Sequence, residues 1–201
     1  HEARHTSALT EQLLMLERLR HSPGGLKTER FDVNHALLSV ATRFGDRAMD
    51  REIDFGFDRS GDVAIIIGDP DLFCEAFENL LDNALVHSGP ELSSISLSLD
   101  VVASTAKISV RDDGRGIAEA DREIVFERFT QLDFGRGSGL GLAIAREIIQ
   151  AHGGNIVAAS GLSGTGAGFE VDLWHQAAIL ELNRVFAHEK LMKATCCTLF
   201  T

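Results

Sequence analysis

The sequence predicts an α/β fold: a two-layer sandwich in which a mixed sheet has its helices on one face. Segments of strand-like alternation and segments of helical spacing alternate imperfectly, and several strands are joined by short turns. With 201 residues, 44% of them hydrophobic, the chain can form one domain with a substantial core. A helical stub is expected to precede this domain.

The first half of the chain begins with a leucine stripe that predicts a helix over residues 6–20, broken by the run at 22–25. A short strand is expected at 29–33, and Asn34 is expected to cap a helix that ends near residue 49. Alternation at 53–57 predicts a strand, and the apolar run 63–67 predicts a buried one.

The second half begins with Asp69 and Pro70, a capping residue followed by a proline suited to the first helical position. The helix they start is expected to end near Val86. Strands follow near 93–101 and 105–111, then a helix from Gly139 to about Ala151, then strands at 155–159 and 168–173.

Composition excludes some classes of protein. The formal net charge of −11 argues against binding to nucleic acid, although a nucleotide site can use backbone amides and a metal ion. No apolar run is long enough to cross a bilayer, so no membrane contact is expected from this segment. The three cysteines form neither a disulfide framework nor a zinc pattern, which fits a reducing compartment.

Four unusual segments follow one another within about seventy residues, and together they indicate a nucleotide site. The first is on the helix 70–86, where Asn79 and Asn83 are one turn apart and share a face. Two carboxamide oxygens on one stripe suit Mg²⁺, which prefers hard oxygen ligands. The alternative is that these side chains bond nearby backbone.

In the second segment, Asp112 ends an alternating strand, where binding residues collect. Its carboxylate could accept a hydrogen bond from an exocyclic amine such as that of adenine. Gly114 and Gly116 would let the backbone turn tightly against a ligand. The alternative is a surface turn, since Asp-Gly is common in turns.

In the third segment, Phe126 and Phe129 are three residues apart, so their rings could share a face and hold a loop in place. Arg128, between them, could meet a phosphate or a surface carboxylate.

The fourth segment, Gly137-Ser138-Gly139-Leu140-Gly141-Leu142, leads into a helix whose N-terminal amides could bind phosphate oxygens. A dinucleotide fold is disfavoured, because no strong strand directly precedes Gly137 and the expected acidic residue is missing.

In this order the four segments resemble the N, G1, F and G2 boxes of the ATP-binding catalytic domain of sensor histidine kinases, in the wider family of gyrase, Hsp90 and MutL. The resemblance implies the Bergerat-type ATP-binding fold over residues 23–174, with 1–22 as the end of the second dimerisation helix. It implies transfer of the ATP γ-phosphoryl group to a histidine, then relay to an aspartate of a response-regulator receiver domain. It also implies a homodimer formed through the dimerisation helices, and a cytoplasmic domain of a protein anchored in the inner membrane.

The resemblance also implies roles for individual residues. Asn83, assisted by Asn79, would ligate Mg²⁺, and Asp112 would bind the adenine amine. Asn79 and Arg128 would be the catalytic residues. The remaining contacts to ATP would come from residues along the four boxes, under a lid at about 130–138: His87, Gly114, Gly116, Ile117, Phe126, Gly137, Ser138, Gly139, Leu140, Gly141 and Leu142.

Asn79 helps to choose among relatives. In the ATPase branches a glutamate one turn before the metal-binding asparagine activates water, which Asn79 cannot do near neutral pH. Glu78 is one residue away and should point elsewhere on the helix. This favours a histidine kinase over an anti-sigma-type serine kinase or a related ATPase. A degenerate nucleotide-binding scaffold stays an alternative because of Val86 and Gln131.

The chain departs from the family at two positions. Val86 and Gln131 stand where the family often has a basic residue, and Arg128 and Arg136 are candidates to compensate. His1 and His5 are too close to the leucine stripe to be phospho-acceptors, so the acceptor is expected to lie in a longer protein. Residues 175–201 form a tail of helical spacing, which is either a docking helix or foreign sequence.

Overall fold

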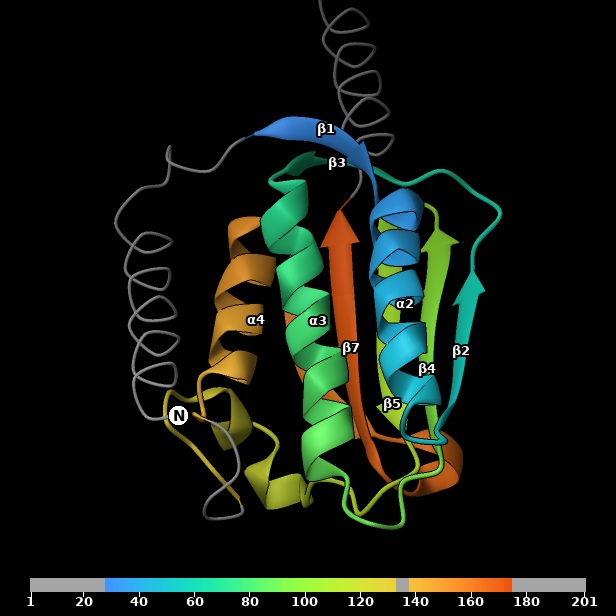
Figure 1. Ribbon diagram of the computed structural model, residues 1–201. Helices are drawn as coiled ribbons and strands as arrows, with labels where there is room; N and C mark the ends of the chain where they lie inside the picture. Colours follow the sequence, from blue (N-terminus) through green and yellow to red (C-terminus); the bar gives the residue numbers. More distant parts are fainter. Residues whose placement is uncertain (1–27, 133–137, 175–201) are drawn as a thin grey trace, which may run out of the picture.

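The computed structural model describes residues 28–132 and 138–174 of the chain (Figure 1). It contains three α-helices in these ranges: α2 (Val33–Met49), α3 (Pro70–His87) and α4 (Gly141–Ala151). Seven strands accompany them: β1 (Glu29–Asp32), β2 (Asp54–Arg59), β3 (Ile65–Gly68), β4 (Ser94–Val102), β5 (Thr105–Asp112), β6 (Asn155–Ser160) and β7 (Ala167–Trp174). Short 3-10 turns lie at Glu119–Asp121, Ile124–Phe126 and Leu162–Gly164.

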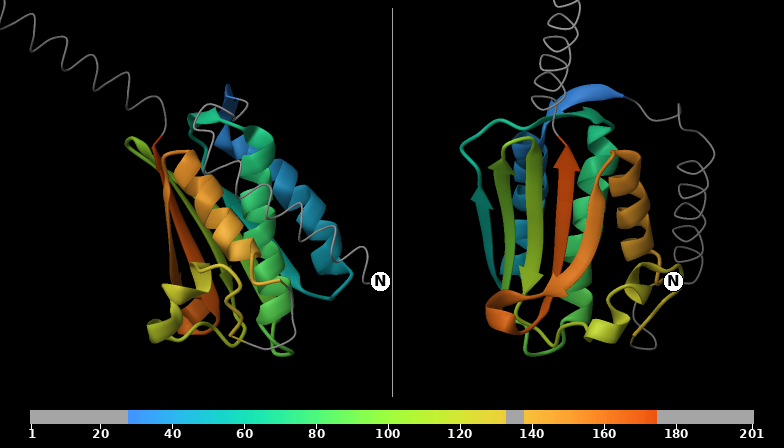
Figure 2. Two further views of the ribbon diagram at one scale, coloured as in Figure 1. Left: turned by 90° about the vertical axis from the view of Figure 1, so that its left-hand side faces the viewer. Right: turned by 180° about the vertical axis from the view of Figure 1, so that it is seen from behind.

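The main sheet has five strands in the order β2-β4-β5-β7-β6. Strands β2 and β4 are parallel and the other neighbours are antiparallel, so the sheet is mixed. All three helices lie on one face of it, which the side view makes plain (Figure 2). The predicted two-layer α/β sandwich is confirmed.

Alternation along the central strands explains why one face holds the core. Ile95, Leu97 and Leu99 of β4 are buried against the helices, while the residues between them face away from the helical layer. On the helical side, Phe73 and Phe77 of α3 are fully buried, with their rings 4.9 Å apart. The core therefore forms between one sheet face and the apolar stripes of the helices.

The start of α3 confirms the capping prediction. The Asp69 carboxylate accepts from the amides of Asp71 and Leu72, and Pro70 takes the first helical position. The Asp69 amide also donates to His152 Nε2 at 3.0 Å, and His152 Nδ1 donates to the carbonyl of Ile148 at 2.8 Å, a pairing that requires the Nδ1–H tautomer. The buried His152 ring thus ties the end of α4 to the beginning of α3.

Three expected boundaries are wrong. Asn34 does not cap α2: Asp32 does, because the fully buried Val33 already belongs to the helix. The run 63–67 is not a buried strand of the main sheet, since β3 begins at Ile65, pairs with β1 and leaves Ile67 44% exposed. Helix α4 begins at Gly141 rather than Gly139, because Gly139 has a left-handed φ of +67°.

The expected helix at 6–20 and the tail at 175–201 lie outside the described residues. Within the ranges 28–132 and 138–174, no helix combines the length and the apolar character that a membrane crossing needs.

Candidate functional site

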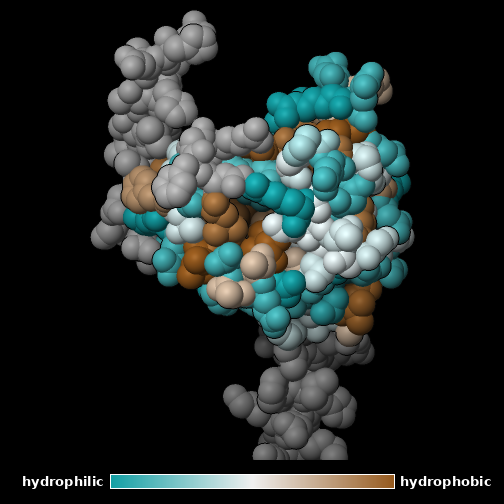
Figure 3. Space-filling model, turned by 90° about the horizontal axis from the view of Figure 1, so that it is seen from below, coloured by the Kyte–Doolittle hydropathy of each residue, from teal (hydrophilic) through white to brown (hydrophobic). Residues whose placement is uncertain are grey.

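A pocket of about 440 Å³ opens at the end of the molecule where α3 ends and α4 begins. This is the lower end in Figure 1, and Figure 3 looks onto it from below, where apolar residues gather among hydrophilic ones. The lining comes from α3, from the loop after β5, from residues 130–132 and from the entry of α4. It contains nine of the site residues expected from the sequence: Asn79, Asn83, His87, Gly116, Ile117, Ser138, Gly139, Gly141 and Leu142.

The two asparagines of α3 face this pocket together, as their one-turn spacing predicts. The entry of α4 comes very close to them: a Cβ on Gly141 would lie 3.4 Å from Asn79 Oδ1. Two asparagine side chains and the N-terminus of a helix therefore line one cavity, with Asn79 directly beside the helix entry.

The N-terminus of α4 has no side-chain cap from the described residues. Leu140 occupies the capping position, and its own amide donates to the Ser138 hydroxyl at 3.3 Å. The first residues of α4, Gly141 and Leu142, line the pocket, and the positive end of a helix dipole at such a place suits an anion.

Asp112 lies behind the pocket lining and is 2% exposed. Its Oδ1 accepts from the amides of Gly114 at 2.9 Å and Ala167 at 3.1 Å. Burial raises the pKa of this carboxyl, and the two amides and the Ser88 side chain oppose that rise. These contacts orient a carboxylate at the base of the site.

Close backbone approach around Asp112 explains the glycines near it. A Cβ on Gly166 would lie 2.0 Å from the Asp112 carbonyl oxygen, and one on Gly114 would lie 2.3 Å from the Ser88 carbonyl oxygen. Gly166 and Gly116 also have left-handed φ values of +73° and +77°. Side chains at Gly114 and Gly166 would displace the carboxylate.

The neighbouring carboxylate, Asp113, has a different place. It accepts from the amides of Ser93 and Ser94, both at 2.9 Å, and from the Ser93 hydroxyl at 2.5 Å. It does not line the pocket. Asp113 therefore holds the start of β4 in place, whereas Asp112 lies buried behind the pocket lining and is bonded to the lining residue Ala167.

The aromatic segment is only partly as expected. Phe126 is buried, with its ring 6.0 Å from that of Phe169, so it supports the loop from beneath without lining the pocket. Phe129 is 59% exposed and has a φ of +64°, so the expectation that the two rings share a face is wrong. The 3-10 turn ends at Phe126, and the chain then changes direction.

Three further expected residues lie outside the lining, namely Gly114, Leu140 and Arg128. Leu140 is fully buried in the core, and Arg128 lies with Nη2 3.8 Å from Glu147 Oε1. The catalytic role of Arg128 stays a prediction. Gly137 and Arg136 lie outside the described residues.

The pocket also contains residues that sequence reasoning did not single out. The charged ones among them are Asp82, Arg115 and Asp121. The lining also includes Val86 and Gln131, the two positions at which the sequence analysis noted a departure from the family. Asp82 could have been found, because it is about 60° around α3 from Asn79 and on the same side of the helix.

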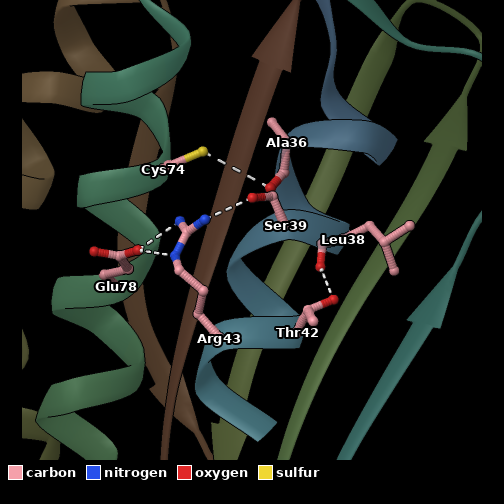
Figure 4. A network of polar contacts seen from close by, with 7 residues as sticks. All are labelled: Ala36, Leu38, Ser39, Thr42, Arg43, Cys74 and Glu78. Carbon is pink, nitrogen blue, oxygen red and sulfur yellow. Dashed lines mark hydrogen bonds and ion pairs between the residues drawn. The ribbon is translucent and has the colours of Figure 1, made fainter. Parts of the chain in front are cut away.

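Glu78 points away from the pocket, as expected. Its Oε1 accepts from Arg43 Nε at 2.9 Å and Nη2 at 2.6 Å, and Arg43 Nη1 donates to Ser39 Oγ at 2.6 Å (Figure 4). In the same interface the Cys74 thiol donates to the carbonyl of Ala36 at 3.7 Å. The glutamate adjacent to Asn79 is thus engaged between α2 and α3.

Comparison with known proteins gives consistent matches. Residues 68–177 match the family of histidine kinase-, DNA gyrase B- and HSP90-like ATPases. The swarming motility regulation sensor protein RssA of Serratia marcescens is 33% identical over 170 residues, covering 83% of this chain and 36% of RssA.

Solved structures agree with this match. Full-length ShkA in complex with AMPPNP has a TM-score of 0.72 and 27% identity, covering 84% of this chain and 35% of ShkA. The mycobacterial sensor histidine kinase MprB has a TM-score of 0.62 and 28% identity, covering 74% of this chain and 97% of that one. The chain spans about a third of the length of RssA and ShkA. It belongs to the histidine kinase-, DNA gyrase B- and HSP90-like ATPase family.

Proposed function

We propose that this chain is the ATP-binding catalytic domain of a two-component sensor histidine kinase, which transfers the γ-phosphoryl group of ATP to a histidine. The observation that carries the proposal is the pocket that Asn79, Asn83 and the entry of α4 line together, with Asp112 buried behind it. Family membership supports it, as do the sensor-protein names of its relatives and the AMPPNP in the ShkA structure.

The donor set of the pocket fits a magnesium nucleotide. Asn79 and Asn83 offer neutral, hard oxygens, and the Asn79 oxygen lies against the helix entry that would hold the phosphates. Bound Mg²⁺ would neutralise charge on the phosphates. The amides at the start of α4 would orient the terminal phosphates, and the Asp112 carboxylate would accept from the adenine amine.

The arrangement favours transfer to a protein side chain over hydrolysis. Phosphoryl transfer depends mainly on positioning and charge neutralisation, which these residues supply. Activation of water needs a general base, and the amide of Asn79 is not one. Glu78, next to it, is hydrogen-bonded to Arg43 outside the pocket.

Nucleotide titration with and without Mg²⁺ tests the binding half of the proposal. Wild-type chain should bind ATP more tightly with Mg²⁺, and Asn83→Ala should lose that gain. Glu78→Ala is the matched control, because it also truncates a polar side chain of α3 but at a position outside the pocket. An Asn83→Ala variant whose metal dependence equals that of wild type would refute the metal role.

A phosphotransfer assay tests the second half of the proposal, the transfer of the γ-phosphoryl group to a histidine. The chain, given labelled ATP and a separate two-helix dimerisation domain that carries an acceptor histidine, should label that histidine. Binding of ATP without any transfer, to this or related acceptor domains, would instead indicate a nucleotide-binding scaffold.

The proposal extends to the longer protein of which this chain would form part. That protein would dimerise through helices before residue 23, pass its phosphoryl group to a receiver domain, and present this domain in the cytoplasm from a membrane anchor. The sensor proteins among the relatives support this context.

A further inference from the structure

The charges in the pocket pose a problem for a polyanionic ligand. The described lining residues include two carboxylates, those of Asp82 and Asp121, and one guanidinium, that of Arg115. Asp82 directly precedes Asn83 on α3, so it is the carboxylate adjacent to the proposed metal and phosphate site. An uncompensated negative charge there would repel a nucleotide in proportion to its number of phosphates.

A residue outside the pocket compensates this charge. Arg47 of α2 places Nη2 2.5 Å from Asp82 Oδ1, a close ion pair although its angle is not that of a hydrogen bond. That oxygen is completely covered, whereas the Asp82 side chain as a whole stays 45% exposed. The Arg47 guanidinium also lies over the Phe44 ring, 5.7 Å from its centroid, which helps to keep it in place.

We propose that Arg47 is a positioning residue for nucleotide binding: it neutralises Asp82 and thereby sets how strongly the pocket favours polyphosphates. The proposal rests on the proposed function, since it requires a nucleotide in this pocket. Arg47 acts only through Asp82. Its removal would leave an unpaired carboxylate beside the phosphates without changing any residue that contacts adenine.

The chain contains a matched control for this idea. One turn earlier on each helix, Arg43 pairs with Glu78 in the same interface between α2 and α3 (Figure 4). The two pairs are similarly exposed, at 52% and 42% for Arg43 and Glu78 and at 49% and 45% for Arg47 and Asp82. Glu78, however, does not line the pocket. Arg43→Gln therefore loosens the same interface without leaving a charge in the site.

Titration of the full chain with MgATP, MgADP and adenosine tests the proposal. A unit negative charge on Asp82 at about 8 Å from the phosphates in water would weaken binding of MgATP, which has about two net negative charges, by about fivefold. It would weaken binding of MgADP, which has about one, by about twofold. Arg47→Gln should weaken binding in that order and leave adenosine unchanged. The effect should fade at about 1 M salt, where the screening length is about 3 Å.

A double variant that removes the Asp82 charge together with its partner completes the test. Arg47→Gln with Asp82→Asn should bind MgATP as wild type does, and Arg47→Lys should stay close to wild type. The proposal is overturned if Arg47→Gln behaves like Arg43→Gln, if adenosine weakens equally, or if Asp82→Asn does not restore binding. A wild-type chain that binds none of the three ligands would overturn the proposed function itself, a result distinct from these.

Discussion

Replacement of the buried Asp112 by asparagine should weaken ligand binding while the chain still folds. The change keeps the shape of the side chain and keeps one oxygen, which can still accept from the Gly114 and Ala167 amides. It exchanges the other carboxylate oxygen for the NH2 of an amide, which is a hydrogen-bond donor. Because burial raises the pKa of Asp112, the ionised carboxylate is costly in the folded state, and asparagine removes that cost at neutral pH. We expect a melting temperature at or above that of wild type.

The loss in affinity follows from the chemistry of the second oxygen. A hydrogen bond from the adenine amine to a carboxylate is worth about 1.5–3 kcal/mol, which corresponds to about a 10- to 150-fold change in the dissociation constant. The amide NH2 of asparagine would also face the exocyclic amine of adenine, so that two hydrogen-bond donors would meet. We therefore expect ATP affinity to fall at least about tenfold.

Calorimetric titration with ATP, alongside thermal melting, measures both effects. Asp113→Asn is the control, since that neighbouring carboxylate accepts from Ser93 and Ser94, whereas Asp112 accepts from Ala167, which lines the pocket. A folded Asp112→Asn variant with wild-type ATP affinity would refute the assignment of Asp112 to adenine. An Asp112→Asn variant that unfolds would refute the account of its two amide contacts.

The same carboxyl predicts a pH dependence with a definite sign. Its folded pKa is raised, so the folded chain holds this proton more tightly than the unfolded chain. Its contribution to the free energy of unfolding therefore falls as pH rises from the ordinary aspartate value, about 3.9, through the raised folded value. ATP affinity should instead fall as the pH is lowered, because acid protonates the Asp112 carboxylate that would accept from adenine. The Asp112→Asn variant should lack this pH dependence.

Three further predictions concern neighbouring groups. Asn79→Glu places a general base beside the proposed phosphate site and should raise ATP hydrolysis without an acceptor; phosphate release at the wild-type rate would count against this placement. Gly166→Ala introduces a Cβ 2.0 Å from the Asp112 carbonyl at a left-handed φ, and should lower the free energy of unfolding by about 2 kcal/mol or more in urea titration; an unchanged midpoint would disprove the close approach. Asp113→Ala should cost about 1 kcal/mol of stability at neutral pH. Although burial opposes it, hydrogen bonds from Ser93 lower the pKa of Asp113, so this cost should be present above the ordinary aspartate pKa and vanish as acid takes the pH through the lowered value; a cost independent of pH would contradict the assignment.

Local patterns were sufficient for most of the fold. Alternation in β4 and β5, the cap at Asp69 and the helical stripe of α3 depend on neighbours in sequence, and each element formed where its pattern predicted. The boundaries at Asn34 and Gly139 were wrong because they depend on burial of Val33 and on the backbone conformation of Gly139. Neither is visible in a local pattern.

In the site, too, some features could be predicted from the sequence and others could not. The one-turn spacing of Asn79 and Asn83 and the glycine run before α4 could be recognised from the chain alone, because helix geometry and the amides of a helix entry are local properties. Their meeting across one pocket required the packing of α3 against α4, which sequence spacing does not encode.

Charge balance is the clearest case in which tertiary structure decides. Arg47 and Asp82 are far apart in sequence and come together because α2 and α3 lie side by side on the sheet. Likewise, Asp112 and Asp113 are adjacent and chemically identical, yet only one is buried at the site. Residue type and order suffice for the family and the helix faces. Burial and ion pairing arise from contacts between distant segments, and so they are known only once the chain is folded.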